Sequence, residues 1–221
     1  MLMISLKDES FTENDIIDPT WVMRYLLNHL SRDNISAEQV VRVVRKMCKR
    51  APGVRIRFKA ARGLKNCFSV SGTFDCEEHK PIEIEISTGS YSKVFKINKK
   101  FYIALIADLA DTLCHESIHR YQYRIRGFEN DYDNNEEQEY YSDPDEVFAY
   151  SVNIAHNLYR QFGPNTLKVL SDYKLIISRD YYLADYYSLF YNQPLFNKLM
   201  KMVYQNVIAI DEGKICHRDK M

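Results

Sequence analysis

Two histidines four residues apart, with a glutamate directly after the first, stand in the stretch TLCHESIHRYQ at 112–122. On an α-helix, residues i and i+4 lie on one face, so the imidazoles of His115 and His119 can both reach one metal ion. Glu116 points about 100° away, where it can hydrogen-bond a water molecule on the metal. This HExxH spacing is typical of a zinc site that activates water for hydrolysis, with Glu116 as general base. The alternative is a helix whose histidines lie on its surface or are satisfied in the core.

A catalytic zinc ion needs a third protein ligand and one open coordination position. The stretch YYSDPDEVFAY at 140–150 offers Glu146, which begins another helix, and we predict it as the third ligand. Three alternatives remain open. Asp145 or His156 could be the ligand instead, or Glu146 could act only as a helix cap, because residues 143–146 also have a capping-box pattern with proline at the first helical position.

The pairing of HESIH with a later DPDEVFAY resembles the zincin metallopeptidases of the gluzincin type, which bind zinc with HExxH and a glutamate from the following helix. The tyrosines before the second helix are locally similar to those of the lethal-factor-like toxin proteases. The resemblance covers about residues 80–162 and implies a zinc-dependent peptidase that acts on a protein or peptide. It also implies that substrate pairs with a strand before the motif helix, which we place in the stretch SYSKVFKIN at 90–98.

Other residues near the motif are candidates for supporting roles. Tyr140 or Tyr141, just before the helix of Glu146, is predicted to stabilise the oxyanion of the tetrahedral intermediate. A histidine that binds zinc is usually oriented by a carboxylate or a backbone carbonyl. We therefore expect three residues to contact the ligands rather than the metal: Asp111, Tyr150 and Asn153.

The elements that must position these residues follow from hydrophobic periodicity. A period near 3.6 predicts helices before and after a central block with period 2, so the fold class is α+β. We expect a zincin-like arrangement, with a small mixed or antiparallel sheet packed on the long HExxH helix and additional C-terminal helices. The expected helices are at 18–30, 36–50, 100–126, 143–162, 165–177, 179–191 and 194–209. The expected strands are at 54–60, 66–74, 82–87 and, with looser alternation, 92–98. We expect an irregular acidic loop between the two helices of the site.

Three segments are expected within one compact domain. Residues 1–53 form a helical segment packed on the core, residues 54–163 form the peptidase-like core, and residues 164–221 form a C-terminal helical segment. The chain has no net charge, yet residues 39–74 contain no Asp or Glu at all. The basic 42–65 segment is most simply a solvated face, but it is also suited to nucleic acid or an acidic partner. A binding protein that uses this segment without catalysis is therefore the alternative function.

The composition argues against disulfide-rich, secreted and membrane-spanning proteins. The chain has 221 residues, of which 46% are hydrophobic and 27% charged, as in ordinary globular proteins. Five cysteines without regular spacing do not predict a disulfide framework, and the sequence contains neither a signal-peptide pattern nor an apolar run of about 18 residues. We therefore expect a cytoplasmic protein with no membrane span.

Overall fold

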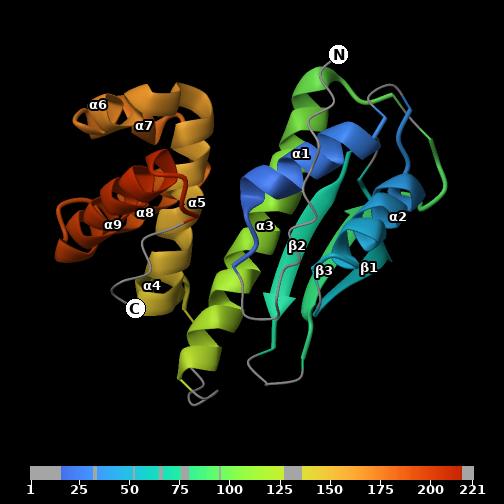
Figure 1. The fold of residues 1–221 in the computed structure, drawn as a ribbon, viewed down its shortest axis with the longest axis horizontal. Coiled ribbons are helices and arrows are strands. Elements are labelled where there is room, and N and C mark those ends of the chain that lie inside the picture. The colour runs from blue at the N-terminus through green and yellow to red at the C-terminus, as the bar shows by residue number, and fades with distance from the viewer. Residues whose placement is uncertain are drawn as a thin grey trace. The chain divides into compact units, whose positions relative to one another are not determined.

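The computed structural model divides the chain into two compact units, Met1–Phe128 and Glu129–Met221, and each is described by itself. The boundary between them differs from the expected ones at 53 and 163. The structure describes residues 16–31, 34–51, 53–64, 67–75, 80–94, 96–126 and 136–215. Figure 1 shows the helices and strands that these residues form.

A mixed three-stranded sheet lies in the first unit. Its strands are β1 (Val54–Ala60), β2 (Ser69–Phe74) and β3 (Ile82–Thr88), in the order β1-β3-β2. The central strand β3 runs parallel to β1 and antiparallel to β2. The expected fourth strand at 92–98 is wrong, because its described residues carry no strand; Phe95 lies outside the description.

The sheet has one apolar and one charged face, as its alternating sequence predicts. Ile82, Ile84 and Ile86 on β3 are fully buried. Their partners across the sheet include Ile56 on β1. The intervening residues form ion pairs on the other face, where Arg57 Nη2 lies 2.6 Å from Glu83 Oε1 and Lys59 Nζ lies 3.4 Å from Glu85 Oε1.

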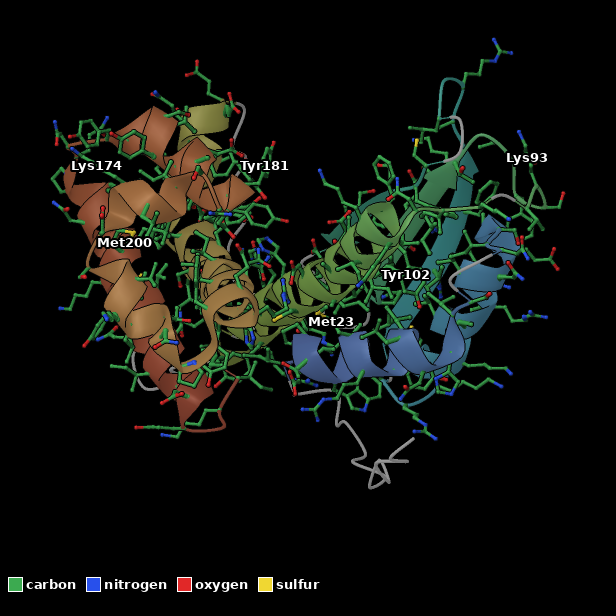
Figure 2. All side chains as sticks on the ribbon, turned by 90° about the horizontal axis from the view of Figure 1, so that it is seen from above. Met23, Lys93, Tyr102, Lys174, Tyr181 and Met200 are labelled. Carbon is green, nitrogen blue, oxygen red and sulfur yellow. The ribbon has the colours of Figure 1, made fainter. Side chains whose placement is uncertain are left out.

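Three helices cover the apolar face: α1 (Pro19–His29), α2 (Ala37–Cys48) and α3 (Lys99–Ile125). Long-range hydrogen bonds join α3 to the chain around α1. The phenol of Tyr102, labelled in Figure 2, donates to the Leu30 carbonyl at 3.0 Å. The backbone N–H of Ile17 donates to Ser117 Oγ at 2.8 Å. These bonds fix both halves of α3 to the residues that flank α1.

Helix α3 changes character along its length. It begins where Asn98 accepts a hydrogen bond from the backbone N–H of Phe101 at 2.9 Å, which caps the first turn. Its first half buries aliphatic residues such as Leu105 and Leu109, whereas its second half also buries several polar and charged ones. The long helix was expected at 100–126 and occupies almost the same residues.

The described part of the second unit is helical. It contains α4 (Glu137–Ser142), α5 (Pro144–Phe162), a 3₁₀ turn (Gly163–Asn165), α6 (Thr166–Leu170), α7 (Tyr173–Ile177), α8 (Tyr181–Phe190) and α9 (Pro194–Asp211). Two expectations are corrected. The acidic stretch is not wholly irregular, because α4 forms within it, and the helix expected at 165–177 is divided into a 3₁₀ turn and two short helices. A buried hydrogen bond from Asn206 Nδ2 to Ser151 Oγ, 2.9 Å long, joins α9 to α5.

The expected fold class, α+β with a small mixed sheet packed on the motif helix, is confirmed. Within the described part of the chain, every helix is too short or too polar to cross a membrane.

Loss of the Ser36 cap should measurably destabilise the first unit. Ser36 Oγ accepts from the Gln39 N–H at 3.2 Å, and Gln39 Oε1 accepts from the Ser36 N–H at 2.8 Å, so both residues satisfy the first turn of α2. We expect Ser36→Ala to lower the free energy of unfolding by about 1 kcal/mol. Urea denaturation followed by circular dichroism measures this. Ser92→Ala, at an exposed serine outside any helix or strand, is the control, and an equal change in both variants would contradict the capping role.

Candidate metal centre

The two histidines of the motif converge on α3. His115 is buried and His119 is half-buried, and their Nε2 atoms lie 3.0 Å apart. Two nitrogens at this distance share either a proton or a cation. Nitrogens that each lie about 2.0–2.1 Å from a tetrahedral zinc ion are about 3.3 Å apart, so the pair needs only a small opening to hold one. The spacing in the sequence therefore produces the convergence that a shared metal requires.

Gln122 orients one of these histidines and was not anticipated from the sequence. Nδ1 of His119 donates to Gln122 Oε1 at 3.0 Å, which leaves the Nε2 lone pair of His119 for a metal. Gln122 is itself buried, so this orientation is held within the protein. The available signal was its position three residues after His119 on the same helix. Asp111, expected to orient a histidine, is buried one turn before His115, and that role stays a prediction.

Glu116 lies against the edge strand β2. Its side chain is 9% exposed and passes over Gly72. A Cβ atom added at Gly72 would lie 2.7 Å from Cγ of Glu116 and 3.0 Å from its Oε1, closer than ordinary contacts allow. The glutamate therefore occupies space that exists because residue 72 has no side chain. A glycine inside a strand is a sign of close approach, but the sequence alone did not identify what approaches.

A second buried charge follows Glu116 one turn later. Arg120 is 8% exposed, and its Nη1 donates to the carbonyl oxygen of Gly53 at 3.4 Å. Gly53 has a φ of +79°, and a Cβ atom there would lie 2.7 Å from Arg120 Nη1. Each of the two buried charges on this side of α3 therefore lies beside a glycine.

Glu146 is the third residue of α5 in the second unit, and its proposed capping role is not observed. In a capping box, its side chain would accept from the backbone N–H of Asp143. That N–H instead donates to the carbonyls of Glu139 and Tyr140 at the end of α4, 3.1 and 3.2 Å away. The helix is capped by the Asp143 carboxylate, which accepts from the Asp145 N–H at 2.7 Å. Glu146 as a cap is therefore wrong, whereas Glu146 as a ligand stays a prediction.

His156, the alternative ligand, forms a hydrogen bond elsewhere in the second unit. It is buried on α5, and its Nε2 donates to the backbone carbonyl of Ile215 at 2.9 Å. A protonated Nε2 cannot coordinate a metal, so this contact competes with coordination through that atom. Asn153 is also buried on α5, and its expected contact with the ligands stays a prediction.

Tyr140 and Tyr141 belong to a cluster of tyrosines in the second unit. The ring of Tyr141 lies 5.3 Å from that of Tyr150 and 5.2 Å from that of Tyr186, and the hydroxyls of Tyr140 and Tyr150 are 3.4 Å apart. Burial raises the pKa of Tyr150 far above its usual range, and the hydroxyl of Tyr140 and the carboxylate of Glu146 raise it further. Burial also raises the pKa of Tyr141. Tyr141 and Tyr150 therefore remain protonated donors near neutral pH, as the expected oxyanion role requires of Tyr141.

Comparison with models of protein families, with curated proteins and with solved structures finds no match for this chain. Its function is therefore inferred from the residues and contacts described above.

Gly72→Ala tests whether β2 makes room for Glu116. Without a clash, alanine would stabilise a strand relative to glycine. We expect Gly72→Ala instead to lower the free energy of unfolding by about 1–3 kcal/mol, because the new Cβ meets Thr112 Cγ2 at 2.5 Å and Glu116 Cγ at 2.7 Å. Thermal unfolding measures the change, with Ser71→Ala on the opposite face of β2 as the control.

A double-mutant cycle assigns this clash to its two partners. In the Gly72→Ala background, Thr112→Ser and Glu116→Ala should each restore part of the lost stability, since each removes an atom that the new Cβ meets. Strictly additive effects of Gly72→Ala and Glu116→Ala would show that the two residues do not contact each other.

Proposed function

We propose that this chain is a zinc-dependent peptidase in which His115, His119 and Glu146 hold the metal and Glu116 is the general base. The observation that carries the proposal is the convergence of two imidazole Nε2 atoms, 3.0 Å apart, on the helix that also buries Glu116. Glu146, which begins α5 in the second unit, is proposed as the third ligand from its position in the sequence after the HExxH motif. Two histidines and a glutamate are a ligand set known from catalytic zinc sites that hydrolyse peptides.

The surroundings of the histidines are suited to zinc. The His119–Gln122 hydrogen bond fixes the tautomer with a free Nε2, so no proton need be lost from that atom on binding. Bound zinc would supply a Lewis acid for water and for the peptide carbonyl. The donors of this group are nitrogen and oxygen atoms, which suit zinc better than copper(I) or calcium.

Glu116 is placed to move protons rather than to bind the metal. It follows His115 directly and therefore points about 100° away from the face that carries both histidines. A carboxylate there accepts a proton from water as the water attacks and donates it to the departing amine nitrogen. Its contact with Gly72 limits the directions that the side chain can take, which keeps the carboxylate close to its working position.

The substrate strand is proposed to pair with β2 rather than with residues 90–98. Among the described strands β1 and β2 are the two edges of the sheet, and it is β2 that carries Gly72, which contacts Glu116. An extended peptide that added to this edge would gain backbone hydrogen bonds and run past the general base. The phenol of Tyr140 or Tyr141 is proposed as the donor to the oxyanion. The substrates are proteins or peptides.

Zinc content and peptide hydrolysis separate the roles of the four residues. We expect the wild type to retain about one zinc ion per chain after dialysis and to cleave members of a fluorescence-quenched peptide library. Glu116→Gln should keep its zinc and lose about 10²- to 10⁴-fold in rate, because only the proton acceptor is removed. His119→Ala should lose both zinc and activity. Elemental analysis and mass spectrometry of the products measure these outcomes.

Neutral substitutions of two neighbouring acidic residues test which of them is the third ligand. Glu146→Gln should bind zinc more weakly and lose activity, whereas Asp145→Asn, at the neighbouring acid, should keep both. A Glu146→Gln variant with full zinc and full activity would eliminate Glu146 as a ligand, and a loss confined to Asp145→Asn would assign that role to Asp145. Wild-type protein that never retains zinc would overturn the whole site.

A further inference from the structure

The outer face of α2 carries an uncompensated row of positive charges. Arg42, Arg45, Lys46 and Lys49 are exposed and recur at the spacing of one helical face. None of the four forms an ion pair with a described residue of the chain. The opposite side of α2 is occupied by the core, where Val40, Val44 and Met47 are buried.

The basic residues of β1 differ from those of α2, although both lie in the basic 42–65 segment. Arg55 and Arg57 both approach the carboxylate of Glu83, at 3.9 and 2.6 Å, and Lys59 approaches Glu85 at 3.4 Å. Because side chains alternate along a strand, these residues lie on the face of the sheet that α2 does not cover. The basic segment therefore forms two surfaces in the structure. The charges on β1 are neutralised by carboxylates of β3, whereas those on the outer face of α2 have no such ion pair with a described residue.

The charge of the first unit favours an anionic partner. Residues 1–128 contain 21 Lys and Arg against 15 Asp and Glu, a net charge of +6, whereas the whole chain has none. The segment around Tyr91 passes the start of α2, where its carbonyl accepts from the Glu38 N–H at 2.9 Å. Exposed Lys93, labelled in Figure 2, lies on this segment and adds a further cation near that end.

We propose that the outer face of α2 binds the phosphate backbone of nucleic acid without reading the bases. From Arg42 to Lys49 the helix rises about 10 Å. Over that distance one strand of a duplex spans about three phosphate-to-phosphate steps, that is about four phosphates, so the four cations match a short run of backbone. The guanidinium groups can bind phosphate oxygens in pairs, and release of condensed counterions supplies the free energy.

Nucleic acid fits this face better than the other anionic partners. A helix that binds a membrane inserts apolar side chains beside its cations. The apolar side of α2 faces the core instead, and no apolar residue interrupts the row. Protein partners usually bury aromatic or aliphatic anchors at the centre of an interface. The row from Arg42 to Lys49 has none, whereas binding to a phosphate backbone requires only cations.

The salt dependence of binding to a labelled oligonucleotide tests the proposal. The probe is a fluorescein-labelled DNA duplex of 20 base pairs and mixed sequence, titrated with full-length protein between 50 and 200 mM NaCl and followed by anisotropy. With four phosphate contacts, the logarithm of the binding constant should fall against the logarithm of salt concentration with a slope of about −3.6. This readout does not involve zinc or hydrolysis, so it is independent of the proposed peptidase activity.

Two triple variants with the same change in charge locate the surface. Arg42→Gln/Arg45→Gln/Lys49→Gln removes two arginines and a lysine from α2. It should weaken binding at least ten-fold and make the slope shallower by about 2.7. Arg55→Gln/Arg57→Gln/Lys59→Gln removes the same residue types from β1 and should have a much smaller effect. All six residues are exposed, and circular dichroism checks that both variants fold.

Four outcomes would overturn the proposal. Equal losses in both triple variants would show that net charge, not the face of α2, attracts the duplex. Wild-type affinity in the α2 variant would place binding elsewhere, and absence of binding at 50 mM NaCl would exclude a nucleic-acid site. Binding of vesicles with 30% phosphatidylserine or of polyglutamate, lost in the α2 variant and without binding of the duplex, would assign the face to a membrane or to an acidic protein.

Discussion

Burial of charged side chains along the second half of α3 is the constraint on which the rest of the first unit depends. Glu116 and Arg120 are each less than a tenth exposed, and an ionised group in a protein interior is costly unless polar groups or space for water accompany it. The neighbouring backbone meets this constraint in two places, at Gly72 and at Gly53. At each position a side chain would collide with the buried charge. Gly53 is favoured as well by its φ of +79°, and Gly72 by the close approach of both Thr112 and Glu116.

The first half of α3 anchors the helix in the core of the first unit. Leu105, Ile106 and Leu109 join the apolar cluster formed with α1, α2 and the isoleucines of β3. Farther along, Ser117 accepts from the backbone of Ile17, so even the polar half is held at a defined position. A catalytic group must be fixed to well under an ångström, and side chains on a rigid helix meet this requirement better than those on a loop. The long helix thus combines an anchored apolar half with the half that carries the candidate site residues.

Hydrophobic periodicity predicted most helices and strands well, but it did not predict which residues would contact one another. The change from a period of 3.6 to a period of 2 located β1, β2 and β3, and the HExxH spacing predicted the convergence of His115 and His119. Residues 92–98 also alternate, yet they form no strand where they are described, because alternation does not provide a neighbouring strand to pair with. The functions of Gly72 and Gln122 depend on which atoms lie opposite them. Which atoms lie opposite a residue is determined by the tertiary structure, and no local sequence pattern reveals it.

The competing roles of Glu146 show how a small unanticipated element can decide between two interpretations. From the sequence alone, capping explains the third position of a helix after Asp143 and a proline almost as well as metal binding does. The formation of α4 argues against the capping box alone, since its last carbonyls accept from the backbone N–H that a capping glutamate would need. Asp143 then caps α5 by itself. Glu146 still lies in the first turn of α5, where its negative charge interacts favourably with the helix dipole. Glu146 as a ligand therefore stays a prediction from the sequence, whereas the convergence of His115 and His119 is directly geometric.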